Sequence, residues 1–313
     1  MASGMKRLAK ETAVYGMSSI IGRFLNWMLV PIYTRVFTNT GDFGIVTNLY
    51  GWVALLLVLL TCGMETGFFR FVNKKEEKEP MRIYVTTLAW IGALAVGFIL
   101  FSLLLLRPIA GLISYTAPLE FLGMMLVITA VDAFCCIPFA YLRYAGQAYR
   151  FAGIKLLSIF LNIFLNVFFL LLCPWLYSHC PASVDWFFRP DYGVGYVFVA
   201  NVITTGVTLV CLLPTIKPGL EARPDFTLLK QMLQSMQALS HKGIFNQTAD
   251  KILFPLLFDD KAEAYRQLGI YGACFKVAVV MVMFIQAFRY AYEPFIFAKN
   301  KNEGNTKAYA EAM

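Results

Sequence analysis

The chain of 313 residues is 59% hydrophobic and only 15% charged, and its mean hydropathy is +0.63. Because soluble domains carry about 25% charged residues, this composition excludes a soluble globular protein and predicts an all-α integral membrane protein. The formal net charge of +8 does not indicate a nucleic-acid partner, since the basic residues gather on one side of the predicted membrane spans.

Apolar runs of about 20 residues, the length needed to cross a bilayer, predict eight membrane-spanning helices. They lie at 13–36, 43–66, 83–106, 119–142, 153–176, 193–214, 240–258 and 268–294. The first, seventh and eighth runs contain charged residues. We therefore expect a six-helix lobe over residues 1–216, an amphipathic connector on the inner side over 217–239, and the incomplete start of a second lobe over 240–313.

The positions of Lys and Arg predict the orientation in the membrane. If the N-terminus is cytoplasmic, 18 of the 27 basic residues fall in inner segments, five in outer loops and four within spans. This alternation follows the positive-inside rule, so both termini are expected in the cytoplasm. Anionic lipids of the inner leaflet attract such residues by about 1 kcal/mol each, which accounts for the basic charge without nucleic acid.

The first predicted span carries polar residues on one face. Ser19, Arg23 and Asn26 recur at spacings of three and four, which place them together on a helix. Arg23 lies about ten residues, or roughly 15 Å, from the inner end, which is too deep for its charge to reach the surface easily. We expect Arg23 to face a lumen. The alternative is a packing stripe in which Arg23 pairs with a carboxylate of a neighbouring helix.

Polar residues also recur in the fourth, fifth and sixth spans. The stripes of the fifth and sixth spans are Ser158, Asn162, Asn166 and Asn201, Thr204, Thr205, Thr208. Small and amide side chains also hold membrane helices together, so each stripe alone fits packing as well as the lining of a lumen. Asp132 is the acid deep in the fourth span. It is either a proton or cation site or the counter-ion of Arg23.

No pattern indicates a metal, a cofactor or a catalytic group. Six of the seven cysteines fall in spans, and the two histidines, His179 and His241, are predicted on opposite sides of the membrane. The outer loop over 178–192 contains Asp185 and Asp191, but no companion base accompanies them. We therefore expect neither a bound cofactor nor enzymatic activity.

The last two predicted spans concentrate charged and amide residues. These are Asn246, Asp250, Lys251, Lys276, Arg289 and Glu293. A charge at the bilayer centre costs about 2.5–3.5 kcal/mol on insertion scales, so such groups usually face a protein interior. Arg289 and Glu293 are four residues apart and can pair on the helix surface. Lys276 has no local partner and is the better candidate for contact with a ligand.

The last two spans also resemble the first two. Gly44 follows Pro31 by thirteen residues, and Gly269 follows Pro255 by fourteen. Both segments are composed of a helix, a proline, a short polar loop, a glycine and a second helix, with an offset of 225 residues between the glycines. Internal repeats with the binding site between them are common in transporters. The alternative is that two helices broken by proline look alike by chance.

Four stretches carry a resemblance to a known family. They are ETAVYGMSSIIGRFLNWMLVPIYTRVF, DFGIVTNLYGWVALLLVLLTCGMETGFFRF, ADKILFPLLF and LGIYGACFKVAVVMVMFIQAFRYAYEPFIFAKN. Together they resemble bacterial polysaccharide biosynthesis flippases of the multidrug/oligosaccharidyl-lipid/polysaccharide exporter superfamily. The resemblance extends over essentially the whole chain and rests on a pattern of helices with GIYG and EPF-type stretches.

This resemblance implies an architecture and a function. Members have two six-helix lobes around a central cavity and pass polyprenyl-diphosphate-linked oligosaccharides from the inner to the outer leaflet by alternating access. The implied location is the bacterial cytoplasmic membrane, and membrane lipids and polysaccharide assembly proteins are the candidate partners. By position, the residues that match the diphosphate-binding cations of related flippases are Arg23, Lys251, Lys276 and Arg289.

The charge pattern extends this list of candidate site residues. Candidate coupling groups or counter-ions are Asp132, Asp250 and Glu293, and the candidate polar lining of the lumen is Ser19, Asn26, Asn162, Asn201 and Asn246.

Three other functions stay open at this point. With a 225-residue repeat, residues 226–313 cover only 88 positions of a second lobe, so we expect a truncated member, and a fragment that transports nothing is one alternative. A multidrug/cation antiporter of the same superfamily is another, although the deep charges are mostly basic. A membrane-bound glycan polymerase or ligase would need a larger outer loop than the sequence provides.

Overall fold

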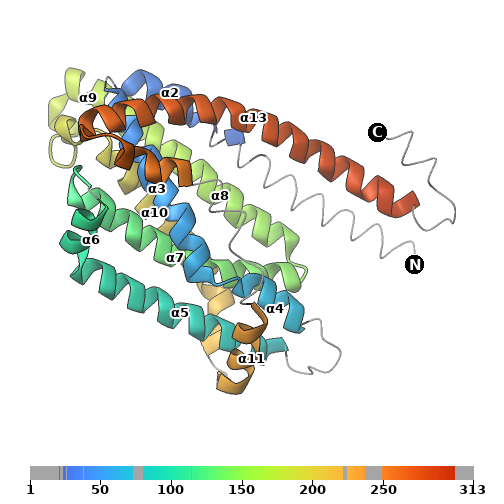
Figure 1. The fold of residues 1–313 in the computed structure, drawn as a ribbon. Helices are drawn as coiled ribbons and strands as arrows, with labels where there is room; N and C mark the ends of the chain where they lie inside the picture. The colour runs from blue at the N-terminus through green and yellow to red at the C-terminus, as the bar shows by residue number, and fades with distance from the viewer. Residues whose placement is uncertain are drawn as a thin grey trace.

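The computed structural model describes residues 21, 24–25, 27–37, 39–72, 80–113, 115–220, 224–236 and 249–299, with only the backbone at 218–220, 235–236 and 282–299. The described residues form helices joined by turns and short loops, with no strand among them (Figure 1). The α-helices are α2 (Leu29–Val36), α3 (Thr40–Thr61), α4 (Met64–Val72), α5 (Pro80–Leu104), α6 (Leu106–Leu112), α7 (Leu119–Tyr144), α8 (Ala148–Val167), α9 (Cys173–His179), α10 (Gly195–Leu220), α11 (Phe226–Met236) and α13 (Lys261–Lys299). Shorter turns are the π-helical η1 (Phe168–Leu172) and the 3₁₀ segments η2 (Pro181–Ser183), η3 (Pro190–Tyr192) and η4 (Phe254–Leu257).

Five helical segments are long and apolar enough to cross a membrane, judged among the described residues. They are Thr40–Val72, Pro80–Leu104, Leu119–Tyr144, Ala148–His179 and Gly195–Lys217. These segments match the second to sixth predicted spans, so the chain is an all-helical protein suited to crossing a membrane several times. The predicted spans 13–36 and 240–258 lie partly outside the described residues, and 268–294 lies within the longer helix α13. The total of eight spans stays a prediction.

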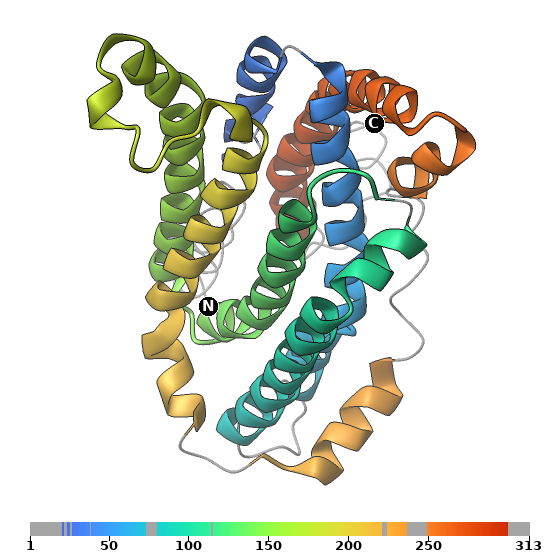
Figure 2. The same ribbon diagram turned by 90° about the vertical axis from the view of Figure 1, so that its left-hand side faces the viewer.

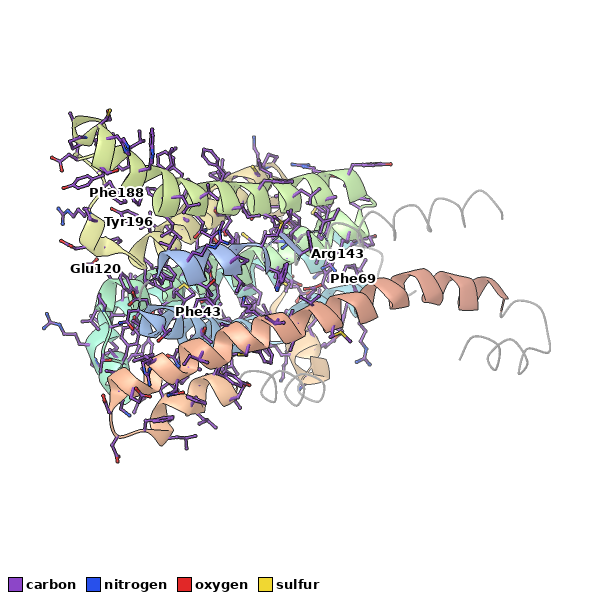
Figure 3. The ribbon with its side chains drawn as sticks, turned by 90° about the horizontal axis from the view of Figure 1, so that it is seen from above. Phe43, Phe69, Glu120, Arg143, Phe188 and Tyr196 are labelled. Atoms are coloured by element: carbon purple, nitrogen blue, oxygen red, sulfur yellow. The ribbon has the colours of Figure 1, made fainter. Side chains whose placement is uncertain are left out.

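Helix α7 is the centre of the bundle and packs against α3, α5, α8 and α10 (Figure 2). Apolar clusters fill the two ends. At the α9 end the rings of Phe188 and Tyr196 stack with centroids 5.1 Å apart (Figure 3). At the α11 end Phe68 meets Tyr84 edge to face, and both are fully buried.

A left-handed turn breaks the second predicted span. Cys62 has φ 47° and Gly63 has φ 67°, and the Cys62 amide donates to the carbonyl of Val58 as the last bond of α3. Such a turn ends a helix because the left-handed conformation cannot continue it. The chain resumes as α4, which packs against α5, α7 and α11.

Helix α11 lies within the segment predicted as the connector and buries one apolar face. Leu228, Leu229 and Met232 are buried against the bundle, where α11 contacts α4 and α5. Asp225 caps the helix, because its carboxylate accepts the amides of the first turn at 2.8 and 3.3 Å. Arg82 of α5 pairs with the same carboxylate at 2.7 Å. The backbone bonds and then Arg82 lower the pKa of Asp225 below its ordinary value.

Helix α13 packs along α3, and glycines permit their closest approach (Figure 1). A Cβ placed on Gly44 would lie 1.9 Å from the carbonyl oxygen of Tyr265, and one on Gly269 would lie 2.0 Å from that of Thr40. Tyr265 and Thr40 each precede the glycine of their own helix by four residues. The contact is therefore reciprocal, and it supports the repeat predicted from the 225-residue offset.

The loop before α13 is held by its own polar groups. Asp260 accepts the amide of Ala262 at 2.9 Å and so caps the helix. The ammonium of Lys261 donates to the carbonyls of Pro255 and Phe258 at 3.1 and 3.2 Å. These bonds fix η4 against the start of α13 and thereby position the side chains that precede η4.

Candidate functional site

The structure describes six of the twelve candidate site residues with their side chains. Those that lie outside the described residues are Arg23, Ser19, Asn26 and Asn246, and those described only as backbone in α13 are Arg289 and Glu293. The remaining six are Asp132, Asn162, Asn201, Asp250, Lys251 and Lys276. They fall into two groups, one where α3 and α13 cross and one inside the six-helix lobe.

Lys251 and Lys276 come together beside α3. The backbone carbonyl of Lys251 accepts a hydrogen bond from Asn48 at 2.9 Å, and the Lys251 Cβ lies 3.1 Å from the position that a Cβ on Gly51 would take. Only a glycine leaves ordinary room for this approach. The ammonium of Lys251 lies 3.9 Å from the centroid of the Phe275 ring, and it is close enough to Lys276 for the two charges to repel.

Rings hold this arrangement in place. Phe254 stacks on Tyr271 with centroids 5.8 Å apart and an interplanar angle of 19°, and Tyr271 in turn lies 6.1 Å from Phe275. The stack connects η4 to α13 and presents the face of Phe275 to the Lys251 ammonium. A cation over an aromatic face gains about 0.5–2 kcal/mol, so this position is favourable for Lys251.

Positive charge exceeds negative charge at this crossing. Within the described part of the chain, no ion pair joins the ammonium of Lys251 or Lys276 to a carboxylate. Asp250 is the acid that interacts electrostatically with Lys251. One of its carboxylate oxygens accepts a hydrogen bond from the Tyr271 hydroxyl. Its other oxygen is buried without a partner among the described residues. Lys251 is half-buried and Lys276 is exposed.

The second group is a chain of hydrogen bonds across four helices of the lobe. The Tyr33 hydroxyl donates to Asn166 at 2.9 Å, and the Asn166 amide donates to Asn162 at 3.2 Å. Asn162 donates to Asn201 at 3.0 Å, and Asn201 donates to the Tyr50 hydroxyl at 2.8 Å. The predicted stripes of α8 and α10 therefore face each other. Tyr50 was not predicted, because its partner lies 151 residues away.

Asp132 lies next to this chain. It accepts a hydrogen bond from the Thr205 hydroxyl at 3.3 Å, which joins α7 to the polar stripe of α10. The predicted pairing with Arg23 lies outside the described residues. Among the described residues, the cation whose charge reaches Asp132 is Lys155 of α8.

A further group of charges lies nearer the α11 end and was missed by sequence reasoning. Glu65 of α4 pairs with Arg143 at the end of α7, and the Cys136 thiol donates to Glu65 at 3.0 Å. The Arg143 guanidinium also lies 5.2 Å from the centroid of the Phe69 ring (Figure 3). Lys155, in turn, has its ammonium 4.3 Å from a ring of α7. Arg143 and Lys155 count among the basic residues of the inner segments, so the sequence offered no reason to expect partners for them inside the bundle.

The chemistry available at these groups is electrostatic. No group of three or more His, Cys, Asp or Glu suited to a metal ion is found in the described ranges. What the two groups offer is a pair of ammonium groups with surplus positive charge and a separate acid inside the lobe. Comparisons of the chain with models of protein families, with curated proteins and with solved structures found no match.

Proposed function

We propose that this protein is a transporter that moves a polyprenyl-diphosphate-linked oligosaccharide from the inner to the outer leaflet of a bacterial cytoplasmic membrane. The observation that carries the proposal is the pair formed by Lys251 and Lys276. Two neighbouring ammonium groups that lack a carboxylate partner in the described residues repel each other. A ligand that carries two negative charges removes this repulsion.

The magnitude of the electrostatic interaction favours a diphosphate. Two opposite unit charges about 4 Å apart attract by roughly 4 kcal/mol at an effective dielectric constant of about 20. Each phosphate group can meet one ammonium, which acts as a point charge with three donors. A diphosphate cannot cross about 30 Å of hydrocarbon unaided, so a cationic surface must replace its hydration. The lipid chain can stay in the bilayer throughout.

The position of the pair also fits transport. Lys251 and Lys276 lie beside the crossing of α3 and α13, which are the helices related by the 225-residue offset. In transporters with internal repeats, the substrate site lies between the repeated units and access alternates as one unit rocks against the other. By this proposal the diphosphate binds where the two units meet.

One observation favours the alternative of a multidrug/cation antiporter. Asp132 is an exposed acid in the middle of α7, and a cationic drug could approach it. The lysine pair opposes a cationic substrate at the crossing of α3 and α13. The two functions therefore predict opposite substrate charges and can be separated directly.

The test uses the whole chain reconstituted in lipid vesicles with a lipid-linked oligosaccharide. Translocation is measured by the access of a membrane-impermeant glycosidase to the glycan, and binding is measured separately with farnesyl diphosphate. We expect Lys251→Gln and Lys276→Gln each to reduce both signals by about tenfold, the effect of losing roughly 1.4 kcal/mol. Lys230→Gln, which removes an exposed lysine of α11, is the matched control.

Wild-type signals in both lysine variants would refute the proposal. Uptake of tetraphenylphosphonium by the wild type, without translocation of the glycan, would instead establish the antiporter. A protein that binds farnesyl diphosphate through both lysines but moves neither substrate would have a diphosphate site without transport activity.

A further inference from the structure

The acid Asp132 is exposed in the middle of α7, whereas the other exposed residues of this helix, Glu120 and Tyr144, lie at its ends. Residues 121–143 of α7 are all described, and among them Asp132 alone is exposed. It lies about 19 Å from either end of α7 at 1.5 Å per residue, so it sits at the middle of a membrane-spanning helix. A carboxylate at this depth is costly unless it faces water or a partner, and such residues commonly serve transport.

The groups around Asp132 come from α3, α8, α10 and α7 itself, whereas α5, which also packs against α7, has no charged residue after Arg82. They are Thr205 of α10, Tyr50 of α3, Lys155 of α8, and Cys135 and Cys136 of α7 itself, with Glu65 of α4 beyond Cys136. Thr205 contributes a hydroxyl, and Lys155 contributes the positive charge. No second carboxylate touches Asp132 among the described residues.

This composition selects the cation that can bind. Calcium takes six to eight oxygen ligands and magnesium demands six in near-ideal geometry. The Asp132 site offers one carboxylate and the Thr205 hydroxyl, and the Lys155 ammonium repels any metal ion that approaches. A proton needs a single oxygen, and once bound it remains compatible with a neighbouring ammonium. The chemistry therefore favours a proton.

Lys155 forms an ion pair with neither Asp132 nor Glu65. Its ammonium lies 4.3 Å from the centroid of the Phe139 ring, and no ion pair holds it among the described residues. Its positive charge interacts electrostatically with both Asp132 and Glu65, but Glu65 already forms an ion pair with Arg143. The Phe139 ring thus holds the ammonium on α7 outside ion-pair distance of either carboxylate.

We propose that Asp132 is a proton-binding site within the six-helix lobe and that Lys155 is its exchangeable counter-ion. When Asp132 is ionised, the ammonium of Lys155 pairs with it. When a proton from water binds the Asp132 carboxylate, its negative charge is lost and Lys155 returns to the face of Phe139. The pairing of α7 with α8 then depends on whether the proton is bound, which provides a means to drive motion with a proton gradient.

Infrared difference spectroscopy on the whole protein in lipid vesicles tests this site without any transport substrate. The spectrum is recorded while the buffer changes from mildly acidic to mildly alkaline, and the carbonyl stretch of a protonated carboxylic acid is followed. We expect a band that is lost as the pH rises and that is absent from Asp132→Asn. Asp185→Asn, which removes an exposed acid from the loop between α9 and α10, should keep the band.

Two further measurements identify the proton and the counter-ion. Lys155→Ala should retain the band to higher pH, because it removes a positive charge that competes with the proton. Added sodium at constant pH should leave the band unchanged. If Asp132→Asn does not fold, Lys155→Ala, which keeps the acid, still tests the proposal through this displacement.

Three results would overturn the proposal. They are the absence of a pH-dependent band, an identical titration in Lys155→Ala, and loss of the band on adding sodium, which would indicate a metal site instead. None of these results bears on the lysine pair at the crossing of α3 and α13, so failure here is distinguishable from failure of the proposed transport.

Discussion

The reciprocal glycine contact between α3 and α13 predicts a large effect from a single methyl group. A Cβ on Gly44 would lie 1.9 Å from the carbonyl oxygen of Tyr265, whereas ordinary contact begins at 3.4 Å. The obstacle is backbone, so a change of side-chain rotamer cannot relieve it. Gly44→Ala therefore requires the separation between the two helices to increase by about 1.5 Å at this contact.

The expected cost follows from two opposing contributions. Overpacking a tight contact destabilises a protein by about 1–3 kcal/mol, and the upper end applies here because the backbone must move. Replacing glycine by alanine inside a helix stabilises that helix by up to about 1 kcal/mol, which offsets part of this cost. We expect Gly44→Ala and Gly269→Ala each to lower the free energy of unfolding by about 2 kcal/mol. The double variant should cost less than the sum, because one separation accommodates both methyl groups.

Titration with sodium dodecyl sulfate, followed by tryptophan fluorescence, measures the free energy of unfolding of the purified protein. Gly97→Ala in α5 and Gly206→Ala in α10 are matched controls, since a Cβ at either position meets nothing within 4 Å. These controls should be as stable as the wild type or slightly more stable. If Gly44→Ala and Gly269→Ala behave like the controls, the close approach of α3 and α13 described above is wrong.

Three further predictions address the lobe and the connector. Asn166→Ala should cost about 1–3 kcal/mol of unfolding free energy because it leaves the buried Tyr33 hydroxyl without its partner, and Tyr33→Phe should restore part of this loss when the two changes are combined. Glu65→Ala and Arg143→Ala should each destabilise the protein by about 1–2 kcal/mol, and the double variant should show positive coupling in the same titration. Because the pKa of Asp225 is lowered on folding, its contribution is present above the ordinary value of 3.8 and is lost as the pH falls through the folded-state pKa. Hydrogen exchange of α11 should accelerate there, but not in Asp225→Asn, whose amide does not titrate.

Long apolar runs made much of the fold predictable. Five such runs coincide with helices of sufficient length, because a segment of about 20 apolar residues has few alternatives to a membrane-spanning helix. The 225-residue offset also predicted a correspondence between Gly44 and Gly269, and the two glycines lie in reciprocal contact. The break at Cys62 was not predicted, since a single non-glycine residue with positive φ leaves no signal in the hydrophobic pattern.

The candidate site was predictable only in part. Charge at unusual depth pointed to Lys251 and Lys276, but their proximity depends on the turn at η4 and on the ring stack that ends at Phe275. The pairing of Glu65 with Arg143 depends on how α4 packs against α7, which helical periodicity within one segment does not specify. Periodicity identifies which residues share a face of a helix, whereas the partner of that face is set by tertiary packing.

The left-handed turn at Cys62 and Gly63 divides the second span into two helical arms, α3 and α4, which have different neighbours. On one side of the turn α3 packs between α7 and α13, and on the other side α4 packs against α5, α7 and α11. A displacement of α13 would therefore act directly on α3, and it would reach α4 through the turn and through α7, which packs against both arms.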